Sequence, residues 1–329
     1  MSKIPLFLNK TLQKSILQSF VIYGIIFVTN SEGGYEMELW TTAHASTLLP
    51  AMIIMAGLAV ALHFLLRHKP DQIRMIPFHI ISALLVGLEI MKQAVSLHRG
   101  YDLYHLPFHF CSLFIFVMPL MSLYRGKHKM AIRAITAALC TSVFLMMAIY
   151  PSLIYSAWDI ENFFRDPLAF HTVVFHNLVV LACFLFPALG ICEGEESRSW
   201  KAVALFMVGF CLVSATMPQL LQTNFNNFYS CNVPPLEALR LQLQGSLGYV
   251  PTQALYVLLV TIADLLFVQL AYWLHRLTGY KRKVAVMWQP LFSVLQQKYN
   301  KTPPATLPHR SRQRPPPGTH LPARPCHPQ

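Results

Sequence analysis

Long apolar runs separated by short polar segments dominate the chain. Seven runs of roughly bilayer length follow Thr42, and each contains few charged residues. A helix of about 20 residues crosses the hydrocarbon core of a bilayer, so each run predicts a spanning helix. The expected spans are Ala45–Leu66, Ile76–Val95, Pro107–Leu123, Met130–Tyr150, Phe170–Ile191, Ala202–Leu221 and Thr252–Leu277. The pattern predicts an all-α, polytopic membrane helix bundle with seven core transmembrane helices.

The segments on either side of this core have a different character. Ser15–Thr29 is apolar and follows three lysines, which fits either a cleaved signal sequence or a short anchor that would add an eighth helix. Pro303–Gln329 is rich in proline, arginine and histidine and cannot bury a core. We expect three parts: an N-terminal segment with its outer loop (1–41), the membrane domain (42–280) and a basic, Pro-rich, disordered tail (281–329).

Composition narrows the class further. The 329 residues are 54% hydrophobic and only 12% charged, which excludes an ordinary soluble domain. The seven cysteines form no C-x-x-C pair, and the histidines lack the spacing of metal ligands. No glycine-rich phosphate loop is present either. We therefore expect no metal site and no cofactor.

Charge sets the expected orientation and one partner. Most of the net charge of +12 comes from the basic segment after Gly279. Lysine and arginine are retained on the cytoplasmic side, so the alternating basic loops predict a multi-pass cell-membrane protein with its core N-terminus outside and its C-terminus cytoplasmic. The basic tail is expected to meet the anionic leaflet. No aromatic-basic module accompanies it, which argues against nucleic acid.

One stretch, His105–Leu113, places a cysteine among polar neighbours where a loop becomes a helix. In the expected topology Cys111 lies just inside the outer surface of the membrane. The start of the fifth span, with His171 and His176, and the loop after the sixth span face the same side. That loop carries the asparagines Asn224, Asn226 and Asn227. Polar groups at such a depth are costly and suggest a functional site.

Helical spacing separates the histidines. His109 and Cys111 are two residues apart and would diverge by about 200° on a regular helix, so a base for Cys111 should come from another helix. His171 and His176 diverge by about 140°, so at most one points along the bundle axis. His176 lies deeper in its apolar run and is the better candidate.

Three further charged residues lie within the spans. Glu89 and Lys92 are three residues apart on one helix face and should form a neutralising ion pair. Asp264 sits near the middle of the last span, and the sequence identifies no partner for it. It would either orient a histidine such as His176 or lie on an ion path.

These residues carry a resemblance to a known family. Leu106-Pro107-Phe108-His109-Phe110-Cys111-Ser112-Leu113, the segment from His171 to His176, and Asn224-Phe225-Asn226-Asn227-Phe228-Tyr229-Ser230-Cys231 resemble the YwaF-type bacterial integral membrane proteins. Those look like relatives of the animal transmembrane ether-phospholipid acyltransferase family. The resemblance covers roughly Thr42 to Leu277. The chain departs from the animal pattern in having Ser112 after the cysteine, where that family has histidine, and in having His109 before it.

The resemblance implies acyl transfer between membrane lipids through a cysteine thioester. Cys111 matches the nucleophile and His176 the general base, with the asparagine loop, His109 and His171 in supporting or oxyanion-stabilising roles. A more distant resemblance to membrane hydrolases of fatty-acid esters makes lipid-ester hydrolysis an alternative. Membrane lipids are the implied substrates.

Structural interpretations of the same residues stay open. Cys111 can be a core cysteine or pair with Cys231 in a disulfide. His176 can simply cross-link helices, and the asparagines can form a turn. A transporter or channel would use the same polar groups to line an outer vestibule, with Glu89, Lys92 and Asp264 on its path. A non-catalytic scaffold or receptor would act through the basic tail.

Overall fold

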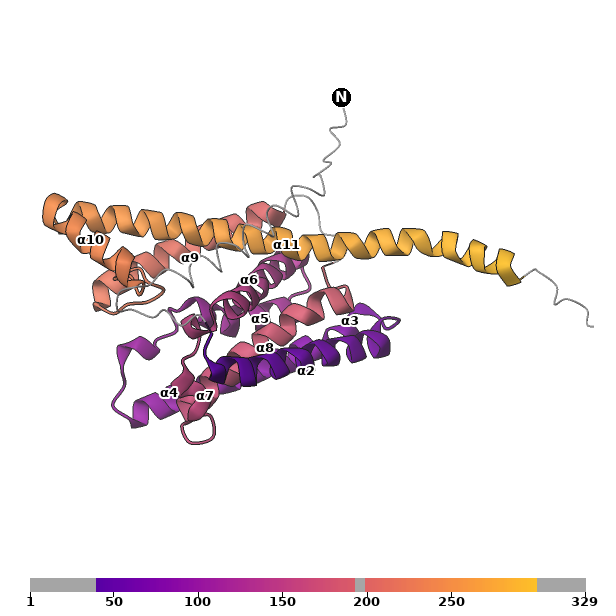
Figure 1. Cartoon of the computed structure of the whole chain (residues 1–329), viewed down its shortest axis with the longest axis horizontal. Helices are drawn as coiled ribbons and strands as arrows, with labels where there is room; N and C mark the ends of the chain where they lie inside the picture. Colours follow the sequence, from indigo (N-terminus) through magenta and orange to yellow (C-terminus); the bar gives the residue numbers. More distant parts are fainter. Residues whose placement is uncertain (1–39, 193–198, 301–329) are drawn as a thin grey trace, which may run out of the picture. The chain divides into compact units, whose positions relative to one another are not determined.

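The computed structural model describes residues 40–192 and 199–300. The chain forms two compact units, Met1–Gly279 and Tyr280–Gln329, and only the first carries the features discussed below. The predicted N-terminal segment Ser15–Thr29, the acidic loop at 193–198 and the tail Pro303–Gln329 lie outside the described residues. The described part of the chain is helical throughout (Figure 1).

The helices follow one another with short connections. The α-helices are α2 (Thr42–Leu66), α3 (Asp71–Arg74), α4 (Ile76–His98), α5 (Phe114–Leu123), α6 (Lys129–Ile149), α7 (Ala157–Glu161), α8 (Pro167–Leu189), α9 (Ser199–Leu221), α10 (Pro234–Leu247) and α11 (Tyr249–Asn300). Three short 3-10 helices, η1 (Leu103–His105), η2 (Phe110–Leu113) and η3 (Pro151–Leu153), lie in the loops.

Within residues 40–192 and 199–300, six helical segments are long and apolar enough to cross a membrane: 42–66, 71–98, 129–149, 167–189, 199–221 and 249–277. They confirm the predicted membrane bundle, and each overlaps its predicted span. The seventh predicted span is shorter than expected. Its helical part consists of η2 and α5, of four and ten residues. At 1.5 Å per residue this is about 21 Å, against a hydrocarbon core of about 30 Å.

The predicted start of that third span at Pro107 is wrong. Pro107 lies in a turn, and the helix begins at Phe110 after an extended His109 (φ −73°, ψ 151°). The turn at Pro107 is held by a hydrogen bond from the Phe108 N–H to the Leu106 carbonyl at 2.8 Å. The start of the span is therefore a shaped loop, and Cys111 sits in the first turn of the helix that follows.

Helix α8 is the centre of the bundle and packs against α2, α4, α6 and α7. Its start is fixed by Asp166, whose side chain accepts hydrogen bonds from the N–H groups of Leu168 and Ala169, and by Pro167 in the first turn. It ends at Gly190 in the left-handed conformation (φ 65°) that glycine adopts without strain. The sides facing its neighbours are buried and mostly apolar, with His171 and His176 as buried polar residues.

Two polar ends cap this bundle. The loops 99–111, 150–166 and 222–233 form one end, which we call the cysteine end; there Arg99 pairs with Asp166 at 2.8 Å. The segments 67–75, 125–133 and 189–191 form the other end, which we call the arginine end. There Asp71 accepts from Lys129 at 2.7 Å and from Arg133 at 2.9 Å. The loops thus alternate between the two ends, as the spans predict.

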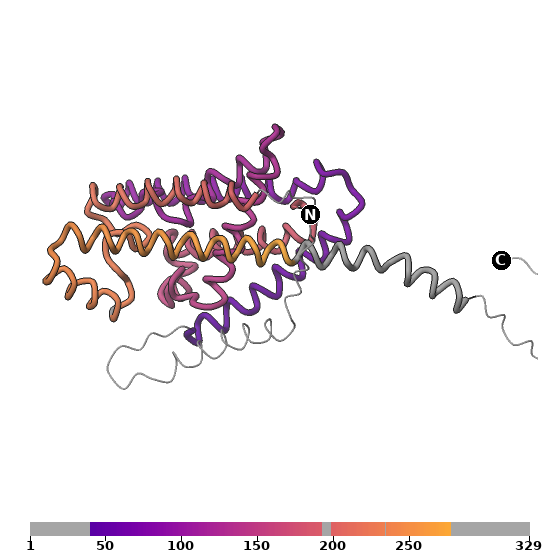
Figure 2. The backbone as a smooth tube through the Cα atoms, turned by 90° about the horizontal axis from the view of Figure 1, so that it is seen from above, coloured from indigo at the N-terminus to yellow at the C-terminus, as the bar shows by residue number. Residues whose placement is uncertain are grey.

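Between α9 and α11 the chain turns back at the cysteine end (Figure 2). This connection contains α10, a 14-residue helix that the hydrophobic pattern did not predict. It mixes leucines with Glu237, Arg240 and glutamines, so it is too polar for a span. Helix α11 continues to Asn300, beyond the predicted boundary at Leu277.

The arginine end depends on one carboxylate. The Arg133 side chain is almost completely buried, and among the described residues its guanidinium reaches only Asp71 and the Ile191 carbonyl, the latter at 3.1 Å. Removing Asp71 would leave a buried cation with one neutral acceptor, which is costly in an apolar surrounding. The pair therefore ties the start of the α3–α4 segment to α6 and to the end of α8.

We expect Asp71→Asn to lower the stability of the bundle by about 2–4 kcal/mol, since it breaks a largely buried ion pair whose carboxylate remains partly hydrated. Thermal unfolding of the purified protein in detergent measures this as a lower midpoint temperature. Glu161→Gln is the matched control, because Glu161 is exposed and forms no ion pair within the described residues. Equal midpoints for the two variants would contradict the structural role of Asp71.

Candidate active site

A cavity of about 240 Å³ at the cysteine end brings together residues from four distant parts of the chain. It is lined by the loop before α5, the end of α6, the asparagine loop and the middle of α11. Its lining residues are Tyr104, His109, Phe110, Cys111, Met146, Leu153, Asn224, Asn226, Asn227, Asn232, Asp264, Phe267 and Val268. Six of the residues singled out from the sequence meet here, so we call it the cysteine cavity.

Cys111 is a free thiol in the first turn of the η2–α5 helix. Cys231, the suggested disulfide partner, is free as well. The disulfide alternative is therefore wrong for this structure. Cys111 is half-buried, and it remains accessible from the cavity.

His109 lines the same cavity as Cys111, contrary to the prediction that the two side chains diverge. That prediction assumed a regular helix, whereas His109 precedes the helix in extended conformation. Its Nε2 lies 2.9 Å from the Tyr104 carbonyl. A carbonyl only accepts, so Nε2 carries the proton, and in the neutral ring Nδ1 keeps the lone pair.

The His109 ring is also held by aromatic contacts. It lies edge-on to Tyr104 at 4.4 Å and to Phe225 at 5.2 Å between ring centroids. Burial lowers the pKa of His109, and the hydrogen bond to Tyr104 works in the opposite direction. The imidazole is thus oriented, and it is neutral at neutral pH.

Asn226 holds the loop that carries His109. Its Oδ1 accepts from the Phe110 N–H at 2.5 Å, and its Nδ2 donates to the Phe108 carbonyl at 2.7 Å. A further bond joins Nδ2 to the buried Ser214 hydroxyl at 3.2 Å. Both amide hydrogens of Asn226 are therefore engaged, so it positions the residues on either side of His109 and does not stabilise an oxyanion.

The other two asparagines differ in their surroundings: the Asn224 side chain bonds within the loop, and the Asn227 side chain lines the cavity. The side chain of Asn224 accepts from the N–H groups of Tyr229 and Ser230 and donates to Asn232, which closes the turn. Asn226 and Asn227 both adopt left-handed backbone conformations (φ 52° and 62°), which asparagine tolerates better than most residues. The Asn227 side chain lines the cavity and forms no hydrogen bond within the described part of the chain.

Asp264 also reaches the cysteine cavity, from α11. The sequence placed it near mid-membrane without a partner. Its carboxylate forms no hydrogen bond or ion pair among the described residues, so it does not cross-link helices there. Tyr256 lies about two turns before Asp264 on α11. Its hydroxyl donates to the Asn227 carbonyl and anchors the helix to the asparagine loop.

His176 does not line the cysteine cavity. It is 7% exposed, and its Nδ1 lies 2.7 Å from the Thr172 carbonyl, which leaves Nε2 buried without a hydrogen bond in the described structure. Its ring faces Tyr155 at 6.4 Å between centroids. His176 and Cys111 both lie towards the cysteine end, but the cavity that contains the thiol is not lined by this predicted base.

Glu89 and Lys92 form the predicted ion pair at 2.8 Å, and the structure adds His171 to it at 3.6 Å from Glu89. Gln93 donates to Glu89 and to the His105 carbonyl, at 2.7 and 2.8 Å. This network joins α4 to α8 and to the loop of η1. It acts as a structural brace, and His171 belongs to it rather than to the cysteine cavity.

A second cavity, of about 350 Å³, adjoins the first. It shares Asn226, Asn227 and Asp264 with the cysteine cavity and extends between α10 and α11. Its lining includes five leucines, Leu236, Leu239, Leu243, Leu255 and Leu259. The only cation in its lining, Arg240, is bound to Glu237 by two hydrogen bonds of 2.6 and 2.8 Å. We call it the leucine groove.

Sequence reasoning missed two positioning groups. Ser214, completely buried on α9, meets both Asn226 and the Phe108 carbonyl. The Tyr104 carbonyl fixes the tautomer of His109. A serine inside an apolar run and a main-chain carbonyl give no pattern in the sequence, so neither carried a recognisable signal.

Comparison with known proteins supports the membrane assignment. Neither the search of curated proteins nor that of solved structures found a match. The family model described as the TMEM164 family matches residues 39–274, which include the whole bundle up to the end of α11's apolar part. The chain is a multi-pass transmembrane protein and belongs to the TMEM164 family.

Proposed function

We propose that the chain transfers acyl groups between membrane lipids through a thioester on Cys111, with His109 as general base and acid. The observation that carries this proposal is the shared cavity. A free thiol and an imidazole with a fixed tautomer and an unoccupied Nδ1 line the same small space. The sequence resemblance to the YwaF-type proteins and the ether-phospholipid acyltransferases supports the same chemistry.

The first half-reaction forms the thioester. His109 Nδ1 takes the thiol proton, and Sγ attacks the carbonyl carbon of a lipid ester. A thiol with an ordinary pKa of about 8.5 needs such a base at neutral pH. When the C–O bond breaks, the proton moves from His109 to the departing alcohol.

The second half-reaction returns the enzyme to its starting state. His109 removes the proton of the acceptor lipid's hydroxyl, whose oxygen attacks the thioester carbonyl. The C–S bond breaks, and the thiolate recovers its proton from His109. Water in place of the lipid hydroxyl would give hydrolysis, so the two activities differ only in the acceptor.

The leucine groove offers a binding surface for the acyl chain of a lipid substrate. It shares Asn226, Asn227 and Asp264 with the cysteine cavity, so an acyl chain lying along the leucines would have its carbonyl carbon close to the cavity of the thiol. Burial of apolar chain against these leucines is favourable, at about 0.8 kcal/mol per methylene. The free Asn227 amide is then the side-chain donor left for the oxyanion.

The transporter alternative gains no support from the braced charges. Glu89 is paired with Lys92 and His171 and accepts a hydrogen bond from Gln93, so both of its carboxylate oxygens have partners. Asp264, the other expected member of an ion path, faces the cavity of the thiol instead. The polar groups thus separate into a brace and a reaction cavity.

Incubation of the purified protein with an alkyne-labelled phosphatidylcholine should attach a hydroxylamine-sensitive acyl label to Cys111. Cys111→Ala should abolish this label and lower transfer on the order of 10⁴-fold or more, as removal of a covalent nucleophile does. Cys231→Ala is the control, since this free thiol lines only the leucine groove. A label that persists in Cys111→Ala would refute the thioester, and labelled free fatty acid as the sole product would identify a hydrolase.

Transfer should lose activity at low pH because protonated His109 cannot accept the thiol proton. Burial places its pKa below the ordinary 6.5, so activity should stay constant around neutrality and fall only at pH values below 6.5. His109→Ala should lower kcat about 10²- to 10⁴-fold and remove this acidic limb. His176→Ala is the decisive comparison. If it alone removes the limb, the base is His176 and the assignment of His109 is wrong.

Asn227→Gly should lower kcat by about 10²- to 10³-fold with little change in KM, because it removes an oxyanion donor while glycine accepts the left-handed backbone. Gln222→Gly is matched in the same loop: Gln222 also has positive φ (51°) but is absent from the cavity lining. Equal kcat values for the two variants would exclude a catalytic role for the Asn227 amide.

A further inference from the structure

A third cavity, of about 460 Å³, lies between α2, α7 and α8, away from the cysteine cavity. It shares no lining residue with either of the cavities described above. Most of its wall is apolar, and none of its 13 lining residues is charged. Its size falls in the range of about 300–1,000 Å³ typical of small-molecule sites.

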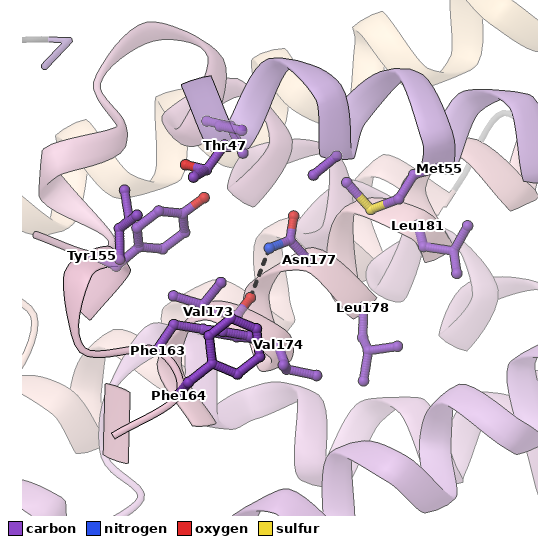
Figure 3. A pocket seen from close by; sticks show the side chains of 13 residues that line it. Thr47, Met55, Tyr155, Phe163, Phe164, Val173, Val174, Asn177, Leu178 and Leu181 are labelled. Atoms are coloured by element: carbon purple, nitrogen blue, oxygen red, sulfur yellow. Dashed lines mark hydrogen bonds between the residues drawn. The ribbon is translucent and has the colours of Figure 1, made fainter. Parts of the chain in front are cut away.

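The polar and apolar groups of this cavity are unevenly distributed. Thr47 and Tyr155 lie on one side, Met55, Leu178 and Leu181 form the opposite side, and Asn177 lies between them (Figure 3). Thr47 is close to the start of α2, and Met55 is two turns further into the span. The cavity is therefore amphipathic, with its polar side nearer to an end of the bundle and its apolar side nearer to the middle.

Asn177 carries an unused acceptor in this cavity. Its Nδ2 donates to the Val173 carbonyl at 2.8 Å, but its Oδ1 is buried and has no hydrogen bond within the described residues. An unsatisfied buried oxygen costs free energy that a ligand donor would recover. The Tyr155 hydroxyl already interacts with the Asn177 side chain, so the two groups lie close together. Burial raises the pKa of Tyr155, so its hydroxyl stays a neutral donor or acceptor.

These groups define the ligand's chemistry. A hydroxyl both donates and accepts, so it can donate to Asn177 Oδ1 and pair with the Tyr155 hydroxyl. An ionised carboxylate or phosphate would find no cation in the lining and would lose its hydration. The apolar side requires a hydrocarbon body, and Phe164 at the rim is 94% exposed, facing where lipid would lie.

We propose that this cavity binds a neutral membrane lipid with a single free hydroxyl, such as a diacylglycerol or a sterol, with the hydroxyl between Asn177 and Tyr155. The lipid enters sideways from the bilayer between α2 and α7. Its orientation matches that of a lipid in a leaflet, polar group towards the surface and hydrocarbon towards the middle. The site is independent of Cys111 and stands whether or not the chain transfers acyl groups.

Photo-crosslinking of the full chain in lipid nanodiscs tests this site. Three probes carry a diazirine in the hydrocarbon part and an alkyne: a diacylglycerol, a sterol and a phosphatidylcholine. One of the two hydroxyl-bearing probes should label peptides that contain Ala51–Met55 or Leu178–Leu181, and the unlabelled form of that lipid should compete. Which probe succeeds identifies the source of the hydroxyl.

Substitutions in the cavity lining test the contribution of single residues to lipid binding. Ala51→Trp fills the cavity and should abolish the label, whereas Ala61→Trp on the exposed side of the same helix should leave it unchanged. Asn177→Leu removes the acceptor and should weaken competition by about five- to tenfold. Unfolding midpoints show that the variants are folded.

Three outcomes would overturn the proposal. They are equal labelling of these peptides by the phosphatidylcholine probe, no labelling by either hydroxyl-bearing probe, and equal labelling of Ala51→Trp and Ala61→Trp. Unchanged competition in Asn177→Leu would remove the assigned position of the hydroxyl.

Discussion

The arrangement of the candidate active site depends on the hydrogen bonds of one side chain, Asn226. It joins the Phe108 carbonyl and the Phe110 N–H, more than a hundred residues earlier in the sequence, to the loop after α9. Inside a membrane protein main-chain groups outside regular helices need internal partners, and this amide supplies two of them. The conformation around His109, and with it the direction of the imidazole towards the cavity of Cys111, follows from that contact.

Pairing distinguishes the polar groups that hold the bundle from those available for chemistry. The carboxylate of Glu89 and the two terminal guanidinium nitrogens of Arg133 have polar partners within the protein, and their networks connect neighbouring helices. Asn227, Asp264 and Asn177 face cavities and keep oxygen or nitrogen atoms without partners in the described structure. Because unsatisfied polar groups are costly in an apolar environment, their occurrence at cavity walls marks the places where a ligand would bind.

The sequence predicted the part of the fold that hydrophobicity determines. The six long spans follow from their apolar runs, and the Glu89–Lys92 pair follows from helical spacing. The site was predicted only in part, because helical geometry was applied to His109 where the backbone is extended. The meeting of Cys111, Asn227 and Asp264 depends on how distant helices pack, and no local pattern encodes that.

His176 and its neighbour Asn177 have different surroundings in the bundle. His176 and Asn177 are neighbours on α8 and point about 100° apart, so Asn177 faces the amphipathic cavity while His176 turns into the bundle. Tyr155 touches both regions, since it lines that cavity and lies against the His176 ring. His176 Nδ1 is fixed by the Thr172 carbonyl, so its orientation is as well defined as that of His109. What distinguishes the two histidines is access: His109 lines the cavity that contains the Cys111 thiol, whereas His176 lines neither that cavity nor the amphipathic one.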